Sequence, residues 1–146
     1  MSVIRRAMAA ALCLLAVACS TDASRDNGPR RQHENNPPSI GFIDIPANGA
    51  TVDPMVRVSG WAADESGIKV VRIYFDDELM VAVPLVTPRP DINKAYPKFA
   101  KPDMIHGFES RIDAGAHAGY TTIRAEAIDG KGGLTQLYSV TVKIRD

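Results

Sequence analysis

The sequence predicts an all-β fold, an antiparallel β-sandwich of about seven strands with one long loop insert. Three observations support this prediction. From residue 39 onward, apolar and polar side chains alternate with a period of two, the pattern of strands with one buried face. Residues typical of turns, chiefly glycine, asparagine and aspartate, separate these segments at short intervals. No segment sustains the three- and four-residue apolar spacing of an amphipathic helix.

Four strands are expected before the long loop. The first ends at Pro46, since proline cannot donate to a strand ladder. The second alternates Val56 and Val58 about Arg57, and the third again places apolar side chains on one face. The acidic run 76–78 is typical of a tight turn into the fourth. The four expected strands are residues 39–45, 55–63, 68–76 and 79–83.

Three further strands are expected after the loop. The glycine-rich segment 130–133 predicts a hairpin between the last two of them. The expected strands are residues 107–113, 121–129 and 134–144. In the last strand, the residues expected on the buried face are Tyr138, Val140, Val142 and Ile144. One or two helical turns are expected near 91–95, and no other helix.

The first 18 residues have the pattern of a secretory signal. Two arginines precede the uncharged run 7–18, which is shorter than the roughly 20 apolar residues that a membrane-spanning helix needs. The segment "LAVAC", residues 15–19, resembles the lipobox of bacterial lipoproteins. That resemblance implies that residues 1–18 are removed and that Cys19 is alkylated with diacylglycerol. The alternatives are a plain secreted protein with an incidental cysteine, or an uncleaved anchor.

The resemblance to lipoproteins also implies a location. Cys19 would hold the protein on a membrane of the bacterial cell envelope, and Ser20 in place of aspartate implies sorting to the outer membrane. Residues 19–38 are polar and contain several prolines, so they are expected to form a flexible tether. Without the signal, basic and acidic side chains nearly balance, so binding to nucleic acid is not expected.

The stretch "GWAADESGIKVVRIYFDDE", residues 60–78, resembles bacterial immunoglobulin-like domains. In these domains Gly-Trp-Ala is followed by an Asp-containing turn and a Val-x-Ile-Tyr strand. "AEAIDGKGG", residues 125–133, looks like their late hairpin. The resemblance covers nearly all of residues 39–146 and implies an immunoglobulin-like sandwich. It implies no particular function, because such sandwiches serve many tasks.

The sequence offers no catalytic set. It has no Gly-x-Ser-x-Gly motif, and Cys13 lies within the signal, so the processed and lipidated protein would have no free thiol and no disulfide. We therefore expect no enzyme, no cofactor and no metal. His106 and His117 are interpreted as polar loop residues, although they could still meet in space. The acidic segments 64–65 and 76–78 are interpreted as turns, with a calcium site as the alternative.

Trp61 is the one tryptophan of the chain. Immunoglobulin sandwiches often carry a tryptophan in the core, so Trp61 is expected to be buried. It is out of phase with Val56 and Val58, unless a bulge near residues 59–60 shifts the register. The alternative is an exposed ring that stacks on a ligand.

The segment 87–107 is the candidate recognition element. Loops longer than about 12–15 residues are uncommon in compact domains and are often functional. Its prolines limit backbone freedom, so ordering it on binding would cost less entropy. Its basic and aromatic side chains suit an acidic protein surface or an anionic glycan. The candidate binding residues are Arg89, Asp91, Tyr96, Lys98, Phe99 and Lys101. The alternative is that Tyr96 and Phe99 cap an open end of the sandwich.

Two functions follow from these expectations. The first is a lipid-anchored module of the cell envelope that presents an immunoglobulin-like domain for protein or glycan binding. The alternative is a structural spacer or accessory subunit of an envelope complex.

Overall fold

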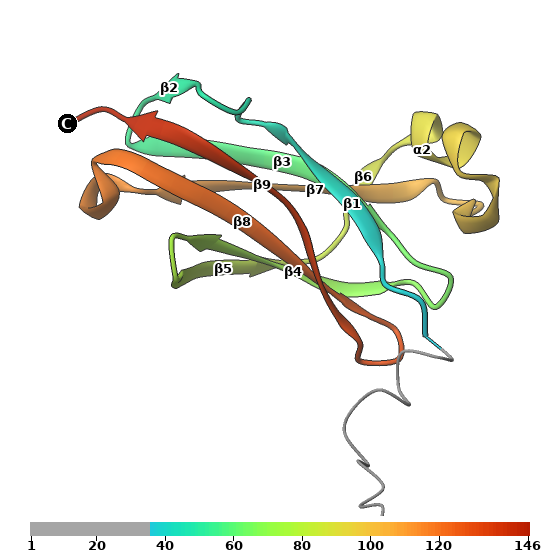
Figure 1. Ribbon diagram of the computed structural model, residues 1–146. Helices are drawn as coiled ribbons and strands as arrows, with labels where there is room; N and C mark the ends of the chain where they lie inside the picture. Colours follow the sequence, from blue (N-terminus) through green and yellow to red (C-terminus); the bar gives the residue numbers. More distant parts are fainter. Residues whose placement is uncertain (1–35) are drawn as a thin grey trace, which may run out of the picture.

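The computed structural model describes residues 36–146, which form two sheets packed face to face (Figure 1). The expected signal, Cys19 and the expected tether up to residue 35 lie outside the described residues. The strands are β1 (Ile40–Ile45), β2 (Thr51–Val52), β3 (Met55–Ala63), β4 (Ile68–Phe75), β5 (Glu78–Val83), β6 (Thr87–Pro88), β7 (Ile105–Asp113), β8 (Gly119–Asp129) and β9 (Leu134–Ile144). The helical elements are α2 (Pro90–Ala95), η1 (Pro97–Phe99) and η2 (Gly115–His117).

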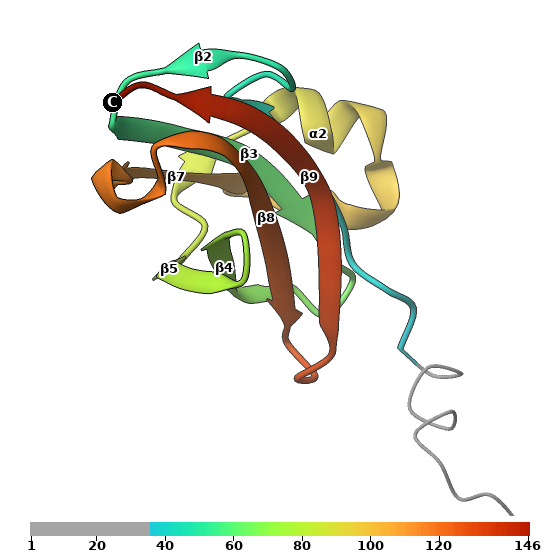
Figure 2. The ribbon, with the colours of Figure 1, turned by 60° about the vertical axis from the view of Figure 1, so that its left-hand side comes forward.

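The strands are ordered β1-β3-β7-β6 in one sheet and β2-β9-β8-β4-β5 in the other. Neighbouring strands are antiparallel, except that β2 runs parallel to β9. Figure 2 shows the two layers from the side of the β8–β9 hairpin. The predicted all-β immunoglobulin-like sandwich is therefore confirmed. The seven expected strands are the seven long ones, and the other two have two residues each.

The main core lies between the two sheets and is built by the alternation that the sequence predicts. Val56 and Val58 of β3 face inward, as do Ile123, Ala125 and Ala127 of β8, and each of these side chains is buried. The large aromatic side chains Phe75 and Phe108 complete this core. Burial of such side chains is the main source of stability for a sandwich of this size.

The expected inward position of Tyr138 is wrong. A β-bulge shifts the β8–β9 register between Arg124 and Glu126, so that Arg124 lies opposite Ser139 and Glu126 opposite Gln136. The extra residue places Leu137 on the inner face, where it is buried, and turns Tyr138 outward. The exposed Tyr138 ring stacks on Phe42 of β1, with 4.5 Å between the ring centroids.

The segment 87–107 has more regular structure than a loop. It contains β6, α2, η1 and the start of β7, and it lies at one end of the four-stranded sheet (Figure 1). The helix expected near residues 91–95 is confirmed as α2, which begins at Pro90, a favourable first residue for a helix. Within residues 36–146, none of the helices has the length and hydrophobicity needed to cross a bilayer.

The interpretation of His106 as a polar loop residue is wrong. Strand β7 begins at Ile105, two residues earlier than expected, and His106 is fully buried in it. His106 is buried because the chain that precedes it folds back over the start of β7. The local alternation of apolar and polar residues does not predict this contact.

Candidate functional site

The candidate site is the insert, defined here as residues 89–104. Its Ile92 and Phe99 side chains form a second hydrophobic cluster with Trp61 and Ala63 of β3. Ala62, which lies between these two residues of β3, belongs to the main core instead. Trp61 and Ala63 therefore occupy the opposite face of the strand. The insert is the element that covers them there.

The expected burial of Trp61 is confirmed, since the side chain is 9% exposed. It does not require a bulge in β3, because the β3–β7 register is continuous from Met55 to Trp61. Trp61 is thus out of phase with Val56 and Val58, as its position in the sequence implies. It is buried beneath the insert rather than between the two sheets.

Hydrogen bonds within the insert fix its conformation. The Arg89 guanidinium donates to Asp91 through Nε (2.9 Å) and Nη2 (2.7 Å), and to Asp44 of β1 through Nη1 (2.7 Å). The bonds from Arg89 hold the pKa of Asp91 below its usual range. Asn93 Nδ2 donates to the Lys101 carbonyl (2.7 Å), and Asn93 Oδ1 accepts from the Lys101 amide (3.1 Å).

The structure separates the six candidate binding residues into two groups. Tyr96 and Lys98 are exposed. The Tyr96 ring lies 5.3 Å from the Trp61 ring, and the Lys98 ammonium lies 4.5 Å from the Phe99 ring centroid.

The other four candidates are held by contacts within the domain, although Asp91 is also exposed. Phe99 is 6% exposed and belongs to the cluster beneath the insert. Arg89 and Asp91 form an ion pair, and the backbone of Lys101 is bound to Asn93. Lys94, which is not among the six residues predicted from the sequence, is exposed on α2. The outward surface of the insert therefore carries Lys94, Tyr96 and Lys98, together with Asp91, which is paired with Arg89.

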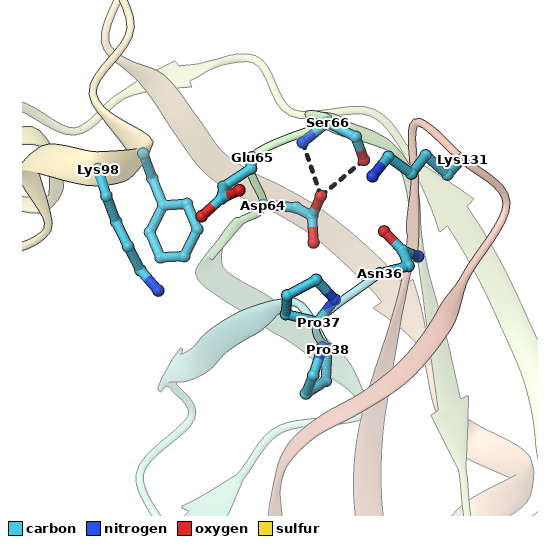
Figure 3. Close-up of a pocket in the computed structure, with 9 residues that line it drawn as sticks. Asn36, Pro37, Pro38, Asp64, Glu65, Ser66, Lys98 and Lys131 are labelled. Atoms are coloured by element: carbon cyan, nitrogen blue, oxygen red, sulfur yellow. Dashed lines mark hydrogen bonds between the residues drawn. The ribbon is translucent and has the colours of Figure 1, made fainter. Parts of the chain in front are cut away.

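A pocket beside the insert was not predicted. It is small and open to solvent. Figure 3 places Lys98 and Glu65 on one side and Asn36 and Lys131 on the other. The lining residues are Asn36, Pro37, Pro38, Asp64, Glu65, Ser66, Lys98, Phe99 and Lys131. No sequence pattern joins these four segments, because only the fold brings them to one end of the sandwich.

The acidic turn beside the pocket has a structural role. Asp64 Oδ1 accepts hydrogen bonds from the Ser66 amide (2.8 Å) and hydroxyl (2.6 Å), as Figure 3 shows. Asp64 Oδ2 accepts from the Ser39 hydroxyl (3.1 Å), which ties the start of the domain to this turn. This arrangement agrees with the interpretation of the segment as a turn.

The second acidic turn, residues 76–78, also has a structural role. Asp76 has a positive φ of 52°, and its Oδ1 accepts a hydrogen bond from the Thr122 amide (3.0 Å). His117 Nε2 lies 3.2 Å from Glu78 Oε2. His117 follows the end of β7 whereas His106 lies at its start, so the two histidines do not meet. Among residues 36–146, no group of three histidine, cysteine or acidic side chains is placed to hold a metal ion.

Comparisons with known proteins give few matches. No family model matches the sequence, and no curated protein matches it either. Among solved structures, the chain is similar to one described as the fibronectin(III)-like modules of Clostridium thermocellum CbhA. The two share 16% sequence identity over 73% of this chain and 96% of that chain, with a TM-score of 0.49.

Proposed function

We propose that this protein is a lipid-anchored interaction module of a bacterial cell envelope. In this proposal Cys19 carries the anchor in the outer membrane, and the immunoglobulin-like domain binds an envelope protein or a glycan. The binding surface is the outward side of the insert, formed by Lys94, Tyr96 and Lys98. The pattern of residues 1–19 supports the location, and the geometry of the insert supports the binding role.

The observation that carries the binding role is the way in which the insert is held. Ile92 and Phe99 are buried against Trp61, so the backbone between them is fixed before any partner arrives. Lys94, Tyr96 and Lys98 are exposed on the same short segment, and the Tyr96 ring also packs against Trp61. A surface that is already ordered loses less conformational entropy on binding.

The chemistry of this surface indicates the class of partner. The two lysines carry positive charge, and Tyr96 offers an aromatic ring with a polar tip. This combination complements an acidic protein surface or a glycan with anionic groups.

The double variant Lys94→Ala/Lys98→Ala tests the binding surface. We expect it to lose most of its retention on isolated cell-wall sacculi, or its capture of a crosslinked envelope protein, because both exposed cations are removed. Its melting temperature should stay unchanged, since neither side chain is buried.

A matched control removes two exposed lysines elsewhere, Lys69 and Lys143, and should bind as the wild type does. Equal retention of the wild type and the Lys94→Ala/Lys98→Ala variant on both probes would contradict the proposed surface.

A spacer or accessory subunit is the second candidate function. The observation that favours it is that the insert covers the sheet: Phe99 and Ile92 pack on Trp61 and bury it. A spacer would be captured with a stoichiometric envelope partner whether or not Lys94 and Lys98 are present. Glycan retention that depends on these lysines would instead support recognition.

A further inference from the structure

His106 lies where the insert meets β7, and its hydrogen bonding is incomplete. The side chain is 0% exposed. Its Nε2 lies 2.7 Å from Asn93 Oδ1 on α2. Its Nδ1 is buried and has no hydrogen-bond partner, the single side-chain atom in this position among residues 36–146. A buried polar atom without a partner is uncommon and calls for a physical explanation.

Asn93 determines which nitrogen of His106 carries the proton. The Asn93 side chain donates to the Lys101 carbonyl through Nδ2 and accepts from the Lys101 amide through Oδ1. These two bonds fix the orientation of the side-chain amide. Because Oδ1 can only accept, His106 must donate to it from a protonated Nε2. The buried Nδ1 is then the unprotonated nitrogen, and its lone pair faces no donor.

We propose that His106 is an acid-sensitive latch: protonation of its Nδ1 releases the insert from β7 and uncovers Trp61. In the docked state the imidazolium charge would be buried away from water, and the backbone carbonyl of Ala62 would compensate it only in part. In the released state water would solvate the imidazolium charge and hydrogen-bond to the new N–H. Acid therefore favours release. A role of the latch in regulating binding rests on the proposed function. The acid-driven release of the insert does not depend on that function.

The charged groups around His106 add to this effect. Lys101 and Arg89 are cations that disfavour the imidazolium, whereas a hydrogen bond to the Ala62 backbone and the Asp103 anion favour it. Arg89 is itself bound to Asp91 and to Asp44 of β1, while Lys94 on α2 is exposed. The neighbouring residues of β3 and β6 carry no charge: Gly60, Trp61, Ala62, Ala63, Thr87 and Pro88.

The direction of the pH dependence follows from burial. Desolvation, and then the charge of Lys101, hold the pKa of His106 below its ordinary value of 6.5. In the released insert the pKa would return towards that value, so the released form binds the proton first as the pH falls. Docking is therefore strongest above pH 6.5 and weakens below it. Arg89 lowers the pKa of Asp91, so this ion pair persists in the same range.

The single tryptophan of the chain reports docking directly, because Trp61 lies beneath the insert. We expect its emission to move to longer wavelength, and its quenching by acrylamide to increase, between about pH 7.5 and 5. The far-UV circular dichroism should stay unchanged, and the change should reverse on neutralisation. His106→Gln keeps a donor for Asn93 but cannot titrate, so its emission should not respond. His117→Gln is the matched control, distant from the insert, and should respond as the wild type does.

Three results would overturn the latch: no change in the wild type, the same change in His106→Gln, or loss of the strand signal together with the change. If His106→Gln does not fold, Asn93→Asp decides, because a carboxylate beside Nε2 favours the imidazolium and should move the transition to lower pH. An unmoved transition would contradict the proposal. No partner enters these measurements, so a failed latch is distinguishable from a failed binding surface.

Discussion

At the scale of single residues, Gly60 shows why the sequence Gly-Trp-Ala occurs in β3. A Cβ atom on Gly60 would stand 2.1 Å from the Phe42 carbonyl oxygen and 2.8 Å from Cζ of Phe108. The first contact is with the backbone of the neighbouring strand and the second with a fully buried ring. The Phe42 carbonyl cannot move away without disturbing the pairing of β1 and β3, and the Phe108 ring cannot move away without disturbing the core. Close approach of the chain is therefore the reason for glycine at this position.

Gly60→Ala should destabilise the domain by about 1–3 kcal/mol, because the added methyl group overpacks a site that has no room for it. Urea unfolding monitored by circular dichroism measures the loss. Gly115→Ala is the control, since a Cβ there would meet only the flexible Asp113 carboxylate at 3.3 Å. Equal stability of the two variants would show that β1 and β3 can separate at little cost.

At the scale of elements, the bulge in β9 changes what the strand presents. It places Leu137 on the inner face in place of Tyr138 and leaves Tyr138 49% exposed. The outward ring then stacks on Phe42, which joins the edge strand β1 of one sheet to β9 of the other. This contact supports an edge of the sandwich where no hydrogen-bonded ladder links the two sheets.

The insert is held mainly by Phe99 rather than by Tyr96. Phe99 is 6% exposed in the cluster beneath the insert, whereas Tyr96 is 38% exposed on its outside. Phe99→Ala should therefore weaken docking by about 3 kcal/mol, since it removes a buried ring and leaves a cavity. We expect Trp61 emission to move to longer wavelength in this variant.

Tyr96→Ala is the matched comparison and should weaken docking less. Both variants should keep the far-UV spectrum of the strands, which contribute the main core. A larger effect of Tyr96→Ala would contradict this assignment and show that the outer ring holds the insert.

At the scale of the whole molecule, the described chain begins at the end of the sandwich that bears the pocket. Asn36 Nδ2 donates to Asp129 Oδ2 (2.7 Å), and the Ser39 amide donates to the Thr135 hydroxyl (3.1 Å). Residues 36–38, assigned to the tether by the sequence, therefore already contact the domain. Burial alone would raise the pKa of Asp129, but hydrogen bonds from Asn36 and from the amides of the turn outweigh it and lower the pKa.

The proposed anchor predicts how the whole protein distributes between membrane and solution. Cys19→Ala removes the thiol that the lipid would occupy, so we expect release from the membrane fraction or accumulation of an unprocessed precursor. Partitioning into Triton X-114 measures both outcomes. Because residues 36–146 do not include Cys19, the domain should melt at the same temperature in either form. Unchanged partitioning would rule the lipid anchor out.

The sequence by itself determined the seven long strands and most of their inward faces. Alternation is a local property: the segments 55–63 and 134–144 coincide with β3 and β9, and 121–129 lies within β8, which begins at Gly119. The short helix could also be predicted, because proline and its neighbours set the backbone there. The candidate residues Tyr96 and Lys98 were selected from the composition of the same segment.

Only the tertiary structure decided which residues depart from the burial that alternation predicts. Tyr138 is turned outward by a bulge that depends on pairing with β8, and Trp61 is buried by an insert roughly thirty residues further along the chain. His106 is buried by the same insert, and the pocket joins four separate segments. Each of these features depends on contacts between residues that are distant in sequence. Such contacts contribute stability only once the sandwich has brought the residues together.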